Sequence, residues 1–243
     1  YGKMLFVRHP DGYLSTYAHL DSFSDKISRV ARREQQQKGR YAINLLIEKN
    51  SLPVEKGEII AYTGDTGFGP PHLHFEIRDQ NLNPVNPLLI SKYNVPDQFP
   101  PVIKRLAISP LGHNSLVGGA AGTKYFSKIP RKGSSYYIPQ VVRIHGDVGF
   151  SIDTEDRASG DWRKTGIYKM LFFLDDSLIY SMKLDRVPQF ESRQIDLHYD
   201  LPMLLGGFGR FQKLYIAEGN SLPFFDHKPN GTGIIDGDQL EEG

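Results

Sequence analysis

The chain has 243 residues, of which 39% are hydrophobic, 23% charged and 12% aromatic, and its formal net charge is +1. So small a net charge gives no support to nucleic-acid binding, which usually needs a strongly basic face. No stretch approaches the roughly 20 consecutive apolar residues of a membrane-spanning helix, so we expect no transmembrane segment. The lack of cysteine excludes a disulfide framework, a thiolate metal site and a cysteine nucleophile. The 24 glycines and 16 prolines favour short strands joined by turns, and therefore an all-β fold.

The first ninety residues alternate strand patterns with turn signals. The predicted strands cover residues 3–9, 13–20, 58–63 and 72–78. Pro10-Asp11-Gly12 joins the first two as a hairpin turn, because Asp-Gly tolerates the positive φ angles of such turns. A glycine-rich loop over 64–71 leads into the last strand. It lacks the lysine that follows a phosphate-binding loop, so we interpret it as a turn.

A basic segment interrupts these strands at about residues 26–50. Its cationic residues near the start are Lys26, Arg29, Arg32, Arg33, Lys38 and Arg40. Residues 28–37 contain alanine and three glutamines but no proline, which predicts a short polar helix. The segment either meets an acidic polymer or lipid headgroups, or is a solvated surface helix, as most charge runs are.

The second half of the chain reads as a separate β domain. Residues 92–101 hold three prolines and are predicted to be a linker between a first domain, 1–91, and a second, 102–230. The predicted strands lie at 142–152, 168–174, 178–184, 193–199 and 212–217. Strands at this spacing predict an immunoglobulin-like β-sandwich. Residues 231–243 are a tail or a truncated continuation.

The segment 72–78 carries the most informative side chains. Residues two apart on a strand share a face, so His72, His74 and Glu76 line one face while Leu73 and Phe75 can be buried on the other. Two imidazoles in adjacent same-face positions can share a small site, one holding a metal ion and the other moving protons. The alternative is a pair of ordinary histidines on a solvated strand.

Four motifs occur in an order found in one family of bacterial enzymes. They are Tyr17-Ala18-His19-Leu20, residues 54–61 (VEKGEIIA), Gly64-Asp65-Thr66-Gly67 and residues 71–78 (PHLHFEIR). In these motifs the chain resembles the lysostaphin/LytM-type zinc metallopeptidases, which are peptidoglycan endopeptidases. The resemblance covers about residues 2–90. It implies a compact antiparallel β peptidase domain with its active site in a groove, and it marks about twenty residues of the basic segment as an insertion.

The resemblance also implies a role for each histidine. His74 matches a zinc ligand, His72 matches the catalytic histidine that acts on the attacking water, and His19 matches the catalytic histidine that stabilises the oxyanion. Zinc lowers the pKa of its bound water to about 7, so a nearby imidazole can complete the deprotonation. The family's two other ligands form a His-x-x-x-Asp motif in a position that would lie upstream of Tyr1. We therefore expect an N-terminally truncated, inactive fragment whose missing ligands and any signal segment lie upstream; His9 and Asp11 are candidate replacement ligands.

By this resemblance the chain is predicted to be a zinc-dependent metalloendopeptidase that hydrolyses peptide bonds of peptidoglycan. Its location would be periplasmic or extracellular, in the cell envelope, and the second domain would position the enzyme or bind an envelope partner. The alternative is a non-catalytic family member that binds and regulates other cell-wall hydrolases. The three histidines argue against that alternative, and the missing ligand pair argues for it. A third interpretation is a wall- or carbohydrate-binding module.

Two further sets of residues were considered as sites. The acidic residues Asp153, Glu155, Asp156 and Asp161 could bind calcium, but they lack the regular spacing of a calcium loop and fit a polar loop equally well. The remaining histidines away from the motifs, His113, His145, His198 and His227, have no partner motif.

Overall fold

The computed structural model describes residues 2–90, 95–159, 164–225 and 231–240. The fold is all-β, as predicted, with 35% of residues in strands and 14% in helices, and its sheets are antiparallel. The chain divides into two compact units, Tyr1–Val85 and Asn86–Gly243. Across the described ranges, no helix is both long and apolar enough to cross a membrane.

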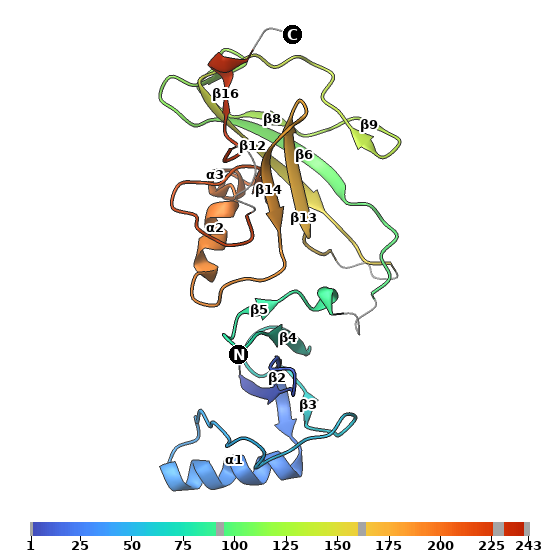
Figure 1. The fold of residues 1–243 in the computed structure, drawn as a ribbon, viewed down its shortest axis with the longest axis vertical. Coiled ribbons are helices and arrows are strands. Elements are labelled where there is room, and N and C mark those ends of the chain that lie inside the picture. Colours follow the sequence, from blue (N-terminus) through green and yellow to red (C-terminus); the bar gives the residue numbers. More distant parts are fainter. Residues whose placement is uncertain (1, 91–94, 160–163, 226–230, 241–243) are drawn as a thin grey trace. The chain divides into compact units, whose positions relative to one another are not determined.

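The first unit is built on one antiparallel sheet (Figure 1). Its strands are β1 (Lys3–Arg8), β2 (Leu14–Phe23), β3 (Ala61–Thr63), β4 (His74–Arg78) and β5 (Pro84–Val85). The order is β1-β2-β4-β5, and β3 also pairs with β2. The four strands predicted here are confirmed, although β2 is longer than expected and β3 and β4 are shorter. The β1–β2 turn closes where His9 N–H donates to the Tyr13 carbonyl, at 2.8 Å.

Strand β2 lies at the centre of this sheet and changes neighbour along its length. It pairs with β4 from Leu14 to Ala18 and with β3 from Leu20 to Phe23. His19 lies between the two ladders with a φ of 58°, in the left-handed region that few residues other than glycine adopt. The sheet therefore splits at His19.

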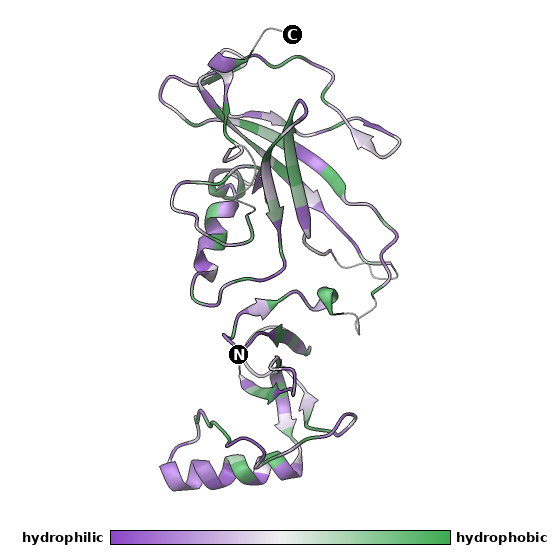
Figure 2. Ribbon diagram, viewed as in Figure 1, coloured by the Kyte–Doolittle hydropathy of each residue, from purple (hydrophilic) through white to green (hydrophobic). Residues whose placement is uncertain are grey.

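The basic segment forms the helix α1 (Asp25–Lys38), which confirms and extends the predicted helix. Asp25 in the first turn complements the helix dipole, and Gly39 ends the helix in the left-handed conformation, with a φ of 58°. Ile27 is its buried residue. Figure 1 shows that α1 lies across the end of the sheet, beyond β2, and Figure 2 shows that it is hydrophilic over most of its length.

The second unit packs a hairpin against a larger antiparallel sheet. The sheet has the order β15-β12-β6-β8, with β16 also paired to β12. These strands are β6 (Val102–Pro110), β8 (Lys124–Phe126), β12 (Asp147–Glu155), β15 (Gln212–Lys213) and β16 (Ile235–Asp236). The hairpin joins β13 (Lys169–Leu174) to β14 (Ser177–Lys183), as predicted. Side chains from both layers form the core: Ile108 and Val148 of the sheet cluster with Ile179 of the hairpin, and the ring centroids of Phe150 and Phe172 are 5.2 Å apart.

Short elements complete the second unit. They are η1 (Pro87–Leu89), β7 (Leu116–Val117) paired with β11 (Ile144–His145), β9 (Arg131–Lys132) paired with β10 (Ser135–Tyr136), η2 (Ser192–Gln194), α2 (Ile195–His198), α3 (Leu201–Leu205) and η3 (Gly237–Gln239). Two antiparallel layers around one core agree with a sandwich, while the immunoglobulin-like assignment stays a prediction.

Three sequence predictions for this unit differ from the structure. Residues 193–198 are helical rather than extended, and their burial has a helical spacing, since the buried His198 lies three positions after the partly buried Ile195. Of residues 212–217 only Gln212–Lys213 is strand. Strand β6 was not predicted, since Lys104 and Arg105 interrupt its apolar pattern; Arg105 is accommodated by Asp153 on β12, its Nε donating to Oδ2 at 2.6 Å.

The hairpin core gives a stability prediction. Met182 on β14 is fully buried, so Met182→Ala should lower the free energy of unfolding by about 2–5 kcal/mol through lost contacts and a cavity. Leu171 on the partner strand is exposed, and Leu171→Ala should cost less than about 0.5 kcal/mol. Urea denaturation followed by circular dichroism measures both. If the two variants lost the same free energy of unfolding, Met182 would not face the core and the hairpin would not pack on the sheet as described.

Candidate functional site

The structure brings together the three histidines that the sequence singled out. The ring centroid of His19 lies 4.6 Å from that of His72 and 5.6 Å from that of His74. His19 comes from β2, His74 begins β4, and His72 forms an isolated bridge with Gly64 just before β4. The predicted proximity of the rings is therefore confirmed; proximity alone assigns no role.

Backbone geometry at the split in the sheet produces this arrangement. The His19 carbonyl accepts a hydrogen bond from Gly64 N–H, and the Gly64 carbonyl accepts one from His72 N–H, each at 3.0 Å. A Cβ on Gly64 would lie 2.6 Å from the Asp21 backbone nitrogen, so this close approach requires glycine. The loop that follows Gly64 is thus held against β2 at the point where His19 turns.

Two of the rings are fixed by main-chain carbonyls. His19 Nδ1 lies 2.9 Å from the Thr66 carbonyl oxygen, and His72 Nδ1 lies 2.6 Å from that of Pro70. Carbonyl oxygens only accept, so both rings donate from Nδ1. The Thr66 hydroxyl donates in turn to the Leu20 carbonyl at 2.7 Å and accepts from Lys3 N–H at 3.0 Å. His19 therefore ties the glycine-rich loop to β2, whereas the His72 contact is local to the segment that precedes β4.

The third ring belongs to a chain of charged groups along β4. His74 Nε2 lies 2.5 Å from Glu76 Oε1, and Arg78 donates from Nε and Nη2 to Glu76 Oε2, each at 2.6 Å. Partial burial raises the pKa of the Glu76 carboxyl, but the hydrogen bonds from His74 and Arg78 outweigh it, and the net pKa is lowered. Because a carboxylate only accepts, His74 Nε2 carries a proton and has no lone pair for a metal ion.

The replacement ligands suggested by the sequence have other partners. His9 Nε2 lies 2.8 Å from the Ser15 hydroxyl, and Asp11 Oδ1 accepts from Tyr13 N–H at 3.1 Å, so both side chains serve the β1–β2 hairpin. Within the described residues, no group of three or more His, Cys, Asp or Glu side chains could hold a metal ion. The residues present do not fit a zinc site, and zinc stays a sequence prediction.

The acidic set in the second unit is neutralised by cations. Hydrogen bonds from Lys104 and Lys164 lower the pKa of Glu155 to about 2. Asp153 pairs with Arg105, and the Asp156 carboxylate accepts from the backbone of the next residue. Asp161 lies outside the described residues, as does His227. Asp153 and Glu155 are thus ion-pair partners and Asp156 accepts a backbone hydrogen bond, and nothing here favours calcium.

Apolar residues near the histidines are exposed, which the strand pattern of the sequence does not predict. Phe68, in the glycine-rich loop, is 86% exposed. Leu73, between His72 and His74, is exposed as well, so the prediction that it is buried is wrong. Both residues belong to the segment that leads into β4, next to the histidines. The signal available in the sequence was a phenylalanine within a run of glycines and prolines.

Comparison with known proteins relates part of this chain to cell-wall proteins. The murein hydrolase activator NlpD of Escherichia coli K12 is 36% identical over 88 residues, which are 36% of this chain and 17% of the relative. DD-carboxypeptidase/endopeptidase Mpg of Neisseria meningitidis serogroup B is 34% identical over 92 residues, which are 37% of this chain and 16% of the relative. Lipoprotein NlpD of Yersinia enterocolitica is 34% identical over 88 residues, which are 36% of this chain and 66% of the relative.

The chain spans about a sixth of the length of the Escherichia coli relative that it matches. No protein-family model matches the chain, and no solved structure matches it. The similarities support a relationship with the LytM family and a connection to the cell wall and its hydrolases.

The prediction that the chain is a metalloendopeptidase is wrong. The relatives from Escherichia and Salmonella are named as activators of murein hydrolases. In the part of the chain that the structure describes, moreover, no group of side chains could hold a metal ion, and His74 donates to Glu76. The catalytic roles of His72 and His19 and the zinc-ligand role of His74 therefore remain inferences from the family resemblance alone.

Glu76 gives a pH-dependent prediction. At neutral pH, Glu76→Gln should destabilise the first unit by about 1–3 kcal/mol, because the buried Arg78 loses its carboxylate partner. The folded pKa is depressed below 4.5, so this stabilisation is present above 4.5 and is lost as the pH falls through the folded value. Urea unfolding at neutral and acid pH measures the difference, which should vanish at acid pH. The exposed pair of Glu58 and Lys26 is the control, and Glu58→Gln should have a much smaller effect.

The backbone of His19 gives a second prediction. The His19→Gly variant should be about 1 kcal/mol more stable than the His19→Ala variant, because the left-handed conformation is strained for alanine and unstrained for glycine. Both variants lose the bond to Thr66, so their difference isolates the backbone. At the neighbouring Ala18, Ala18→Gly should instead destabilise by about 0.5–1 kcal/mol. Thermal unfolding measures both differences. If glycine were less stable than alanine at position 19 as well as at position 18, the left-handed backbone of His19 would not be strained.

Proposed function

We propose that this chain regulates cell-wall hydrolases as a non-catalytic LytM-type module that binds a murein hydrolase and raises its activity. The observation that carries the proposal is the similarity to proteins named as murein hydrolase activators, in a chain whose described side chains form no metal-ligand group.

The hydrogen bonds of the histidines support a binding role. In the sequence, the presence of His19, His72 and His74 argued against a regulator, since a regulator needs no reacting centre. Their contacts supply another reason for these residues: His19 ties the glycine-rich loop to β2, His72 contacts the Pro70 carbonyl at the end of that loop, and His74 holds Glu76. A regulator needs a surface of fixed shape, because a preorganised surface loses less entropy on binding.

The exposed residues on that loop support a protein partner. Phe68 projects from the fastened loop, and Leu73 and Tyr62, both exposed, belong to the adjoining segments. Large aromatic residues are enriched among the residues that dominate binding energy at protein interfaces. In this proposal Phe68 is the anchor that enters the hydrolase.

The place of action follows from the same relatives. One of them is named a lipoprotein and others act on murein hydrolases by name, so we place this chain in the cell envelope, next to peptidoglycan. The second unit would then hold an envelope partner or set the position of the first.

The test is an activation assay with the whole chain. The chain is mixed with purified insoluble murein, with and without a purified murein hydrolase, and the release of soluble fragments is measured. The chain alone should release nothing above background, and it should raise the rate of the hydrolase. Phe68→Ala should weaken half-maximal activation at least about tenfold, as expected for an interface anchor.

Phe190→Ala is the matched control, because Phe190 is equally exposed but lies in the second unit; it should activate like the wild type. Release of fragments by the chain alone would contradict the proposal. So would stimulation that is the same for the Phe68 variant and the wild type, since the anchor would then be elsewhere.

A further inference from the structure

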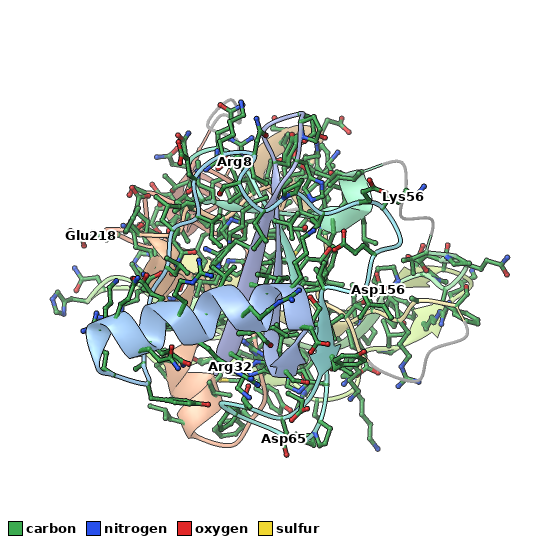
Figure 3. All side chains as sticks on the ribbon, turned by 90° about the horizontal axis from the view of Figure 1, so that it is seen from below. Arg8, Arg32, Lys56, Asp65, Asp156 and Glu218 are labelled. Atoms are coloured by element: carbon green, nitrogen blue, oxygen red, sulfur yellow. The ribbon has the colours of Figure 1, made fainter. Side chains whose placement is uncertain are left out.

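Helix α1 has a cationic face that the proposed function does not use. Arg29, Arg32 and Arg33 are spaced by three and four residues, so they share one side of the helix, and all three are exposed. The opposite side carries the buried Ile27, and the half-buried Val30 lies between the two sides. Figure 3 looks onto α1, with Arg32 labelled.

The charges on this face are uncompensated. Lys26 pairs with Glu58 at 3.2 Å and Lys38 pairs with Glu34 at 2.5 Å, on the flanks of the helix. Among the described residues, the side chains of the three arginines on the face make no ion pair, hydrogen bond or contact with an aromatic ring. The net charge of the whole chain is only +1, so this is a local concentration of positive charge.

Exposed apolar side chains follow the cationic face directly in sequence. Tyr41 is 78% exposed and Leu46 is 91% exposed, and Ile47 is exposed as well. They lie in a segment without regular secondary structure that leads from α1 back to β3 (Figure 1). Gln35 ties the start of this segment to the helix, since its Nε2 donates to the Tyr41 carbonyl at 2.8 Å. Cations and large apolar groups are thus combined in one insertion.

We propose that this insertion surface, formed by α1 and residues 40–47, binds a membrane surface rich in anionic lipids. Arginines attract lipid phosphates, and aromatic and leucine side chains bind at the boundary between headgroups and acyl chains. A hydrated acidic wall polymer would use the arginines but leave Leu46 and Tyr41 in water. The combination of charge and apolar exposure therefore favours the lipid surface. The inference is independent of hydrolase activation and goes beyond it.

The arginines and the apolar residues make separable contributions. Each cation near an anionic membrane contributes about fivefold in affinity, so three arginines together contribute on the order of 100-fold. This part is screened by salt, since the Debye length is about 8 Å at physiological ionic strength. The apolar part persists in salt. Binding should therefore weaken with salt but not vanish.

The test uses the whole chain and vesicles of defined lipid. Cosedimentation is measured with phosphatidylcholine vesicles and with vesicles of phosphatidylcholine mixed with phosphatidylglycerol. The wild type should bind the anionic vesicles and not the neutral ones. Arg29→Gln, Arg32→Gln and Arg33→Gln combined should lower the affinity on the order of 100-fold, because glutamine keeps the helix propensity and removes the charge.

A second triple variant removes the same charge elsewhere. Lys128, Lys132 and Arg143 are exposed in the second unit, and their replacement by glutamine should leave vesicle binding unchanged. Leu46→Ser should weaken the binding that remains in high salt. Circular dichroism and thermal unfolding establish that every variant is folded.

Three results would overturn the proposal. They are equal binding of the wild type to both kinds of vesicle, equal loss of binding in the two triple variants, and binding of purified murein through the three arginines without any binding of anionic vesicles. Each result can be told apart from a failure of the proposed activation, because a chain that fails to bind lipid can still stimulate a hydrolase in solution.

Discussion

The first unit depends on one strand that has to serve two neighbours. β2 pairs with β4 and then with β3, and the two ladders are interrupted at the residue between them. His19 supplies the break by adopting a left-handed conformation. The cost of that conformation, about 1–2 kcal/mol, is offset by the pairing on both sides. The same turn brings the His19 ring to His72, so the fold and the candidate site share one constraint.

The hydrogen bonds around the histidines distinguish two uses of one sequence pattern. A zinc site needs ring nitrogens with lone pairs that converge on one point. In this unit His74 donates to Glu76, and Glu76 is held in turn by Arg78. His19 and His72 donate to main-chain carbonyls of the loop. These contacts hold the rings in place, and they support the binding role proposed above.

The two proposed contacts lie on different parts of the first unit. Phe68 belongs to the loop beside the histidines, whereas the arginines belong to an insertion at the end of β2. A module with separate surfaces for a hydrolase and for a lipid surface would bind most tightly where both are present. Effective concentration then adds to the affinity of each contact without any new interface.

The sequence by itself determined the local features of this protein. Alternating apolar residues gave the strands, Asp11-Gly12 gave the hairpin, and the two-residue period of strands placed His72 and His74 together. Tertiary structure decided what depends on distant partners. Strand β6 pairs with β12 and β8, and Asp153 across the ladder neutralises its Arg105; in helix α2 the buried side chain is His198. The hydrogen bond between His74 and Glu76 is likewise visible only in the folded site. A sequence pattern places side chains on a face but does not select their hydrogen-bond partners.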